Sequence, residues 1–128
     1  MPHIAEAYAT VEKISASGRQ LEASALFRVA RSLQLAHDQW GRPGAEAKLD
    51  EALKQNQRLW TFFQAELSAP DNPLPPDLKV RLLSLIEFID KRTFDLMAFP
   101  AKEKIPVLIN INRNIAAGLA ANPSGVAA

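Results

Sequence analysis

Apolar residues recur every three or four positions in four long segments of the chain, a spacing that places them on one face of an α-helix. In the first segment Leu26, Leu33 and Trp40 fall on such a face. Alanine and leucine dominate all four segments while valine and threonine are sparse, which favours helix over strand. Four helices are therefore predicted, over about residues 17–40, 43–67, 75–97 and 105–120. The expected fold class is all-α, a compact bundle of four main helices.

Capping residues and prolines mark the borders of these segments. Ser17 followed by Gln20 has the capping-box pattern that begins a helix, and Gly41 with Pro43 predicts where that helix ends. The other borders also carry prolines, which interrupt a helix because they lack a backbone N–H. The chain is predicted to divide into an N-terminal arm or short helix at 1–17, a helical domain at 18–120 and a flexible tail at 121–128.

Composition narrows the class of protein. The 128 residues are 48% hydrophobic, which suffices for one core in a single domain, and the lack of cysteine excludes disulfides and thiolate metal sites. A net charge of +1 without long runs of one sign argues against a nucleic-acid-binding face. Neither a secretory signal nor an apolar run of roughly 20 residues, the length of a membrane span, is visible. We expect a cytoplasmic protein that neither crosses a membrane nor binds nucleic acid.

Candidate catalytic and metal-binding groups are few. His3 and His37 have no second histidine or carboxylate at ligand spacing on the same helix face. The chain contains no HExxH motif, no glycine-rich phosphate loop and no GxSxG motif. We therefore expect a protein that is not an enzyme and that needs no metal or cofactor.

Some large apolar residues fall outside the predicted apolar stripes. These residues are Phe27, Leu35, Phe62, Val80, Leu83 and Ile109. Two explanations are open: neighbouring helices or loops cover them on the flank of the bundle, or several of them form an exposed patch for a partner protein or a second copy of the chain.

The order of several short sequences along the chain resembles the FlaF family of flagellar biosynthesis regulators. The resemblance covers about residues 5–120 and is carried by AYA at 7–9, SGRQLE at 17–22, NQRLW at 56–60, LPPDL at 74–78 with RLLSL at 81–85, and PVLININR at 106–113. Two departures from the family pattern are the second proline of the Pro75–Pro76 pair and Asn110, where an acidic residue is expected.

The resemblance implies a small helical protein without enzymatic activity that supports flagellin production and export. It implies binding to flagellin as a dedicated secretion chaperone or adaptor, and action opposite to the repressor FlbT. The alternative is an adaptor that acts on FlbT or on the translation machinery without contacting flagellin. In either case the partner is a protein, and both the oligomeric state of the chain and the face that binds stay open.

The candidate partner-binding residues combine the surplus apolar side chains with polar residues of the family-like sequences. They are Phe27, Leu35, Asn56, Arg58, Trp60, Phe62, Leu83, Asn112 and Arg113. Trp60 also lies on the predicted core stripe, so burial is the alternative for its ring. Hydrogen bonding within the bundle is the alternative for the two asparagines, and solvation is the alternative for the two arginines.

Overall fold

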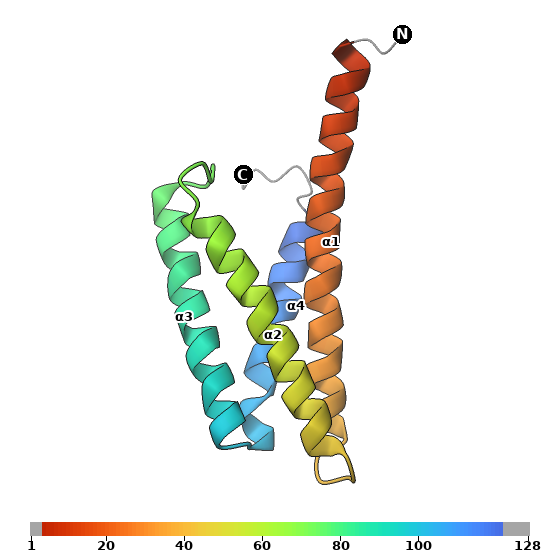
Figure 1. Ribbon diagram of the computed structural model, residues 1–128, viewed down its shortest axis with the longest axis vertical. Helices are drawn as coiled ribbons and strands as arrows, with labels where there is room; N and C mark the ends of the chain where they lie inside the picture. The colour runs from red at the N-terminus through yellow and green to blue at the C-terminus, as the bar shows by residue number, and fades with distance from the viewer. Residues whose placement is uncertain (1–3, 122–128) are drawn as a thin grey trace.

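The computed structural model describes residues 4–121, with side chains from residue 18 onward, as a bundle of four antiparallel α-helices (Figure 1). The helices are α1 (Ile4–Asp38), α2 (Ala45–Ser68), α3 (Pro76–Ala98) and α4 (Pro106–Ala121), and a short 3₁₀ turn, η1 (Lys102–Lys104), precedes α4. No strand occurs within residues 4–121. The predicted all-α bundle of four main helices is confirmed.

The start of the first helix is the main difference from the predicted boundaries. α1 begins at Ile4 and passes through Ser17 and Gly18 without a break, so the predicted start at Ser17 is wrong. A single glycine inside a helix costs only about 1 kcal/mol, too little to interrupt an alanine-rich segment. The division into an arm, a domain and a tail stays a prediction, and most of the tail lies outside the described residues.

The turn between α1 and α2 depends on two glycines. Gly41 and Gly44 both have φ of 82°, in the left-handed region that favours glycine because other residues place a Cβ too close to the backbone. Gly44 directly precedes α2, and the N–H of Lys48 donates to its carbonyl oxygen. This sharp reversal sets α2 against α1 and begins the bundle.

The helices pack closely in the order α3, α2, α1, α4, and this series does not close into a ring. Within the described residues, α1 packs against α4 and α2, and α2 packs against α3, but α3 makes no comparable contact with α4. The core lies between all four helices and includes the fully buried Leu26, Leu33, Leu53, Ile86 and Leu108. One side of the bundle, between α3 and α4, is thus less tightly closed than the others.

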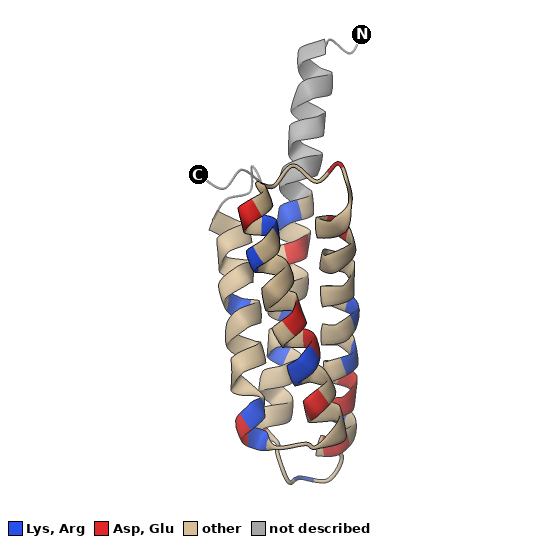
Figure 2. Ribbon diagram, turned by 90° about the vertical axis from the view of Figure 1, so that its left-hand side faces the viewer, with Lys and Arg blue, Asp and Glu red and all other residues tan. Residues whose placement is uncertain are grey.

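The surplus apolar residues separate into two groups. Ile109 is buried in the core and Leu83 packs half-buried against it, so flank packing accounts for both. Phe27, Phe62 and Val80 are exposed, as is Leu35. Phe94 and Phe99, which the apolar pattern did not single out, are exposed as well. On the face that Figure 2 shows, acidic and basic residues are mixed, without a continuous stripe of one sign.

Candidate functional site

An apolar pocket lies at the end of the bundle where the α2–α3 loop crosses. We call it the end pocket; its volume is about 410 Å³, within the roughly 300–1,000 Å³ common for ligand pockets. All four helices and the loop contribute to its lining. The apolar lining residues are Trp60, Phe63, Leu67, Pro73, Leu74, Leu78, Leu82, Ile115 and Leu119.

The walls of the end pocket come from pairs of residues one helical turn apart. Leu78 and Leu82 on α3 face Ile115 and Leu119 on α4 across the side of the bundle that is not closely packed. Residues four apart lie on one helix face, separated by about 6 Å along the axis. Leu82, Ile115 and Leu119 pack against the core with only part of their surface. Each wall therefore offers a short apolar ridge to a molecule that enters.

The α2–α3 loop is held by one asparagine at the rim of the pocket. The Nδ2 of Asn72 donates to the carbonyl oxygen of Glu66 at 3.0 Å, and its Oδ1 accepts from the N–H of Leu74 at 3.0 Å. Asparagine suits this position because its short side chain bonds to nearby backbone. Pro76 then starts α3, where a missing N–H is harmless. The loop thus places Leu74 on the pocket.

A buried chain of polar side chains crosses the core beneath the end pocket. The Nε1 of Trp60 donates to Asn112 Oδ1 at 2.9 Å, and Asn112 Nδ2 donates to Asn56 Oδ1 at 2.8 Å. Asn56 Nδ2 makes a long contact of 3.5 Å with Thr93 Oγ1, and this hydroxyl donates to the carbonyl oxygen of Ile89 at 2.7 Å. Side chains of α2, α3 and α4 are thereby linked, and the Trp60 ring is fixed at the base of the pocket.

Burial separates the candidate partner-binding residues. Asn56, Trp60 and Asn112 are at most 2% exposed and bond to one another, so the intramolecular alternative holds for the two asparagines and the burial alternative holds for Trp60. Arg58 and Arg113 are exposed, and Arg113 makes a long contact of 3.5 Å with Gln34. A partner-binding role for the two arginines stays a prediction.

The remaining candidates lie outside the end pocket. Phe27, Leu35 and Phe62 are exposed on the outer surface, whereas Leu83 is half-buried. Of the nine candidates, only Trp60 lines the pocket. The apolar pocket residues on α2, α3 and α4 were missed because their positions on the apolar stripes predict burial. One sequence feature could have indicated them: they lie near helix ends, where the apolar stripe of a helix can extend past the neighbouring helix that buries it.

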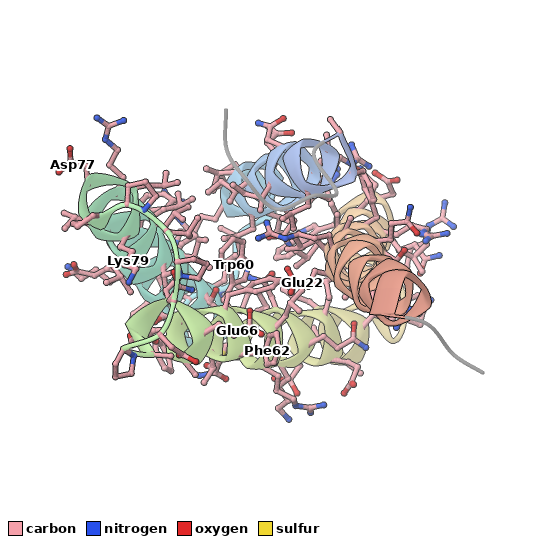
Figure 3. The ribbon with its side chains drawn as sticks, turned by 90° about the horizontal axis from the view of Figure 1, so that it is seen from above. Glu22, Trp60, Phe62, Glu66, Asp77 and Lys79 are labelled. Atoms are coloured by element: carbon pink, nitrogen blue, oxygen red, sulfur yellow. The ribbon has the colours of Figure 1, made fainter. Side chains whose placement is uncertain are left out.

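Two carboxylates and one guanidinium add charge to the end pocket. Glu22 and Arg19 extend from α1 and Glu66 from α2, while the lining residues of α3 and α4 carry no charge. In the view from above, Glu22, Trp60 and Glu66 gather between α1, α2 and α4 (Figure 3). Burial raises the pKa of Glu22, the nearby Glu66 carboxylate raises it further, and Arg19 lowers it. Arg19 therefore offsets only part of the unfavourable effect that burial and the Glu66 carboxylate have on the ionised form of Glu22.

Comparison with known protein families identifies the family of this chain. The family model for the flagellar protein FlaF matches residues 4–119 and so contains every residue of the end pocket. The chain belongs to the FlaF family. This membership makes it a flagellar protein and confirms the resemblance carried by the short sequences. Neither a curated protein nor a solved structure matches this FlaF-family chain.

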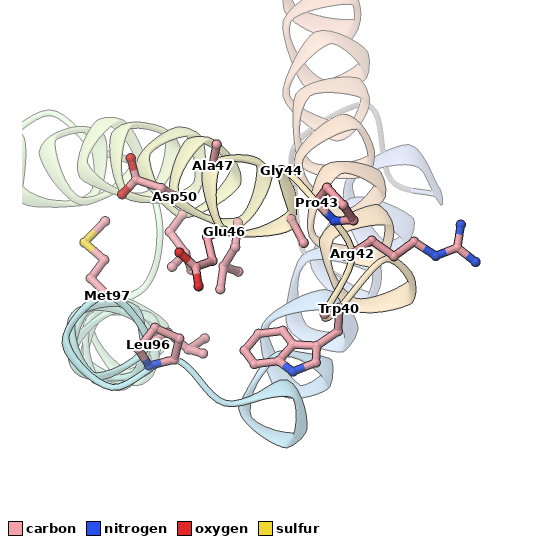
Figure 4. A pocket seen from close by; sticks show the side chains of 14 residues that line it. Trp40, Arg42, Pro43, Gly44, Glu46, Ala47, Asp50, Leu96 and Met97 are labelled. Carbon is pink, nitrogen blue, oxygen red and sulfur yellow. The ribbon is translucent and has the colours of Figure 1, made fainter.

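A second pocket of the FlaF-family protein lies at the opposite end of the bundle. Its volume is about 850 Å³, and it is bordered by the α1–α2 turn and the end of α3. The Trp40 ring is directed into this space opposite Leu96 and Met97 (Figure 4). Trp40 is 37% exposed, so its predicted place on the core stripe is wrong. α1 ends at Asp38, and the turn that follows carries the ring away from the stripe.

Neither a candidate metal site nor a candidate membrane span occurs in the described part of this FlaF-family structure. Among the described side chains, no three His, Asp or Glu residues come close enough together to hold a metal ion. None of the helices within residues 4–121 combines the length and the apolar character that crossing a membrane requires.

Proposed function

We propose that this FlaF-family protein binds flagellin in the cytoplasm as a dedicated secretion chaperone or adaptor, and that it acts without catalysis and opposite to FlbT. The observation that supports binding is the end pocket, which is lined by apolar side chains from α2, α3, α4 and the α2–α3 loop at one end of the bundle. Its occupant would be an apolar helical segment of flagellin that must not assemble before export.

The shape of the pocket suits helix-in-groove recognition. A partner helix presents apolar residues at positions i and i+4, and these match the spacing of Leu78 with Leu82 and of Ile115 with Leu119. Each large apolar side chain that leaves water on binding contributes about 1.5–3 kcal/mol before the entropy of association is subtracted. Two or three such side chains suffice for reversible binding, which a protein that must release its cargo requires.

Gel filtration and calorimetry of the purified protein with monomeric flagellin test this proposal. We expect a stoichiometric complex that Leu78→Asp weakens, because the new carboxylate loses hydration inside an apolar wall. Val80→Asp is the matched control, since it lies on the same helix but outside the pocket and is 64% exposed. We expect this control to bind as the unmodified protein does.

Three outcomes would count against the proposal in different ways. Two separate peaks at all micromolar concentrations would exclude direct chaperoning. Equal losses in Leu78→Asp and Val80→Asp would place the partner on the outside of α3 rather than in the end pocket. A complex with FlbT and none with flagellin would favour the alternative of an adaptor.

A further inference from the structure

We propose that the end pocket selects a helix that carries a lysine or arginine next to its apolar residues, with the cation placed between Glu22 and Glu66. The proposal deepens the proposed function, because it names the chemistry of the segment that this pocket would take. Its occupant is one helical segment with two apolar side chains a turn apart and one basic side chain beside them.

The charge of the pocket lies on one side. Glu22 on α1 and Glu66 on α2 flank the base formed by Trp60, whereas the wall built by α3 and α4 presents only uncharged side chains. A helix lying along the α3–α4 wall would therefore turn its opposite edge toward the two carboxylates. This arrangement fixes where on the partner the basic residue must be.

Arg19 only partly neutralises Glu22 in the free protein. Arg19 lies three residues before Glu22 on α1 and is the one cation among the described lining residues. Its effect is smaller than that of burial and of repulsion by Glu66, since the pKa of Glu22 stays raised. A second cation would form charge-assisted hydrogen bonds with Glu22, which is already partly removed from water, and with the exposed Glu66.

The same geometry predicts how binding depends on pH. The charged groups facing Glu22 are Arg19 from α1 and Glu66 from α2, and neither α3 nor α4 adds one among the described lining residues. A bound cation favours the ionised form of Glu22 and so lowers its pKa. Binding therefore releases protons, and affinity rises with pH between the lowered pKa of the complex and the raised pKa of the free protein.

Calorimetric titration with flagellin compares four proteins: the unmodified chain, Glu22→Gln, Glu66→Gln and Glu51→Gln. Glutamine keeps the shape of the side chain and removes the charge. Glu51 is exposed on α2 and outside the end pocket, so this control changes the net charge equally. We expect roughly three- to tenfold weaker binding for each pocket variant and no change for the control. The salt dependence of the affinity should decrease in the pocket variants alone.

The outcomes separate the charge proposal from the proposed function. If flagellin binds but Glu22→Gln and Glu66→Gln bind it as tightly as the unmodified chain, the charge proposal is wrong and the chaperone role stands. An equal loss in Glu51→Gln also overturns the charge proposal, since it would show only a long-range effect of net charge.

If flagellin does not bind at all, the proposed function fails and small probes still decide the charge proposal. The probes are n-octylammonium and octanoate, which share a chain and differ in the sign of the head group. We expect the ammonium to shift the backbone amide signals of Leu82 and Ile115 at lower concentration, and Glu22→Gln to remove this preference. Equal binding of the two probes, or no shift with either, overturns the proposal.

Discussion

At the scale of single residues, the buried polar chain has the clearest consequences. Trp60, Asn112, Asn56 and Thr93 satisfy one another, and the described residues contain no buried side-chain nitrogen or oxygen without a partner. Such a chain adds modest net stability, because the same groups bond to water in the unfolded protein. It does penalise any arrangement of the helices that separates its members, and so it fixes how α2, α3 and α4 meet.

Asn112→Ala tests this role. The substitution leaves the Trp60 N–H and the Asn56 Oδ1 without their partner. Each orphaned buried group costs about 1–3 kcal/mol, so a loss of roughly 2–6 kcal/mol in unfolding free energy is expected. Urea denaturation followed by circular dichroism measures it. Asn110→Ala is the control, because Asn110 is exposed on the same helix, and its effect should stay within about 0.5 kcal/mol. Equal, small effects of both variants would contradict the assigned role.

Phe62 and Leu83 differ in burial, although the apolar pattern treats them alike. Phe62 is 50% exposed, whereas Leu83 packs against the core. Phe62→Asp should therefore lower the melting temperature little and Leu83→Asp should lower it clearly, since only the second carboxylate is forced out of water. Thermal unfolding of both variants checks this difference. A large destabilisation by Phe62→Asp would show that its ring contact with Phe63 matters more than its exposure indicates.

At the scale of helices, the sequence predicts the elements well because they depend on local properties. Periodicity, alanine content and proline borders locate all four helices within a few residues, except for the start of α1. The predicted start at Ser17 was wrong because a capping pattern permits a helix to begin but does not require it to. The residues before Ser17 also favour helix, so the helix begins earlier. The predicted burial of Trp40 was wrong for a related reason. The apolar stripe was extended to residue 40, but the helix ends at Asp38.

Two glycine substitutions with opposite expected signs test the boundaries of α1. Gly18→Ala should raise the unfolding free energy by about 0.5–1 kcal/mol, because Gly18 is inside the helix and an added Cβ meets no atom within 4 Å. Gly44→Ala should lower it by roughly 1–2 kcal/mol, because φ there is +82°. Chemical denaturation measures both. No gain from Gly18→Ala would indicate that α1 does not pass continuously through this residue.

At the scale of the whole molecule, the end pocket depends on relations that no single segment encodes. Its residues come from four helices and a loop, and α2, α3 and α4 carry the apolar ones on ordinary apolar stripes. The stripes become a pocket because α3 packs on α2 and α4 on α1 while α3 and α4 stay apart. The apolar pattern of the sequence predicts which side chains avoid water. It does not predict which of them stay exposed, because that depends on how the neighbouring helices are placed.

The charge in the end pocket makes a prediction for the stability of the unbound protein. Because the pKa of Glu22 is higher in the folded chain than its ordinary value, the folded state binds more protons than the unfolded state in the window between the two values. The contribution of Glu22 to stability is therefore fully present below its ordinary pKa and is lost as pH rises through the raised one.

Glu22→Gln removes this loss, so the variant should gain stability relative to the unmodified chain as pH is raised from about 4 to about 7. The difference between the two proteins is the relevant quantity, because the raised pKa of Asp90 and the lowered pKa of Asp38 act equally on both. Urea midpoints across this range measure it, and Glu51→Gln serves as the exposed control. A constant difference across the range would mean that the Glu22 carboxylate is as well hydrated in the folded protein as in the unfolded chain. The pocket would then present no partly neutralised Glu22 carboxylate to a partner.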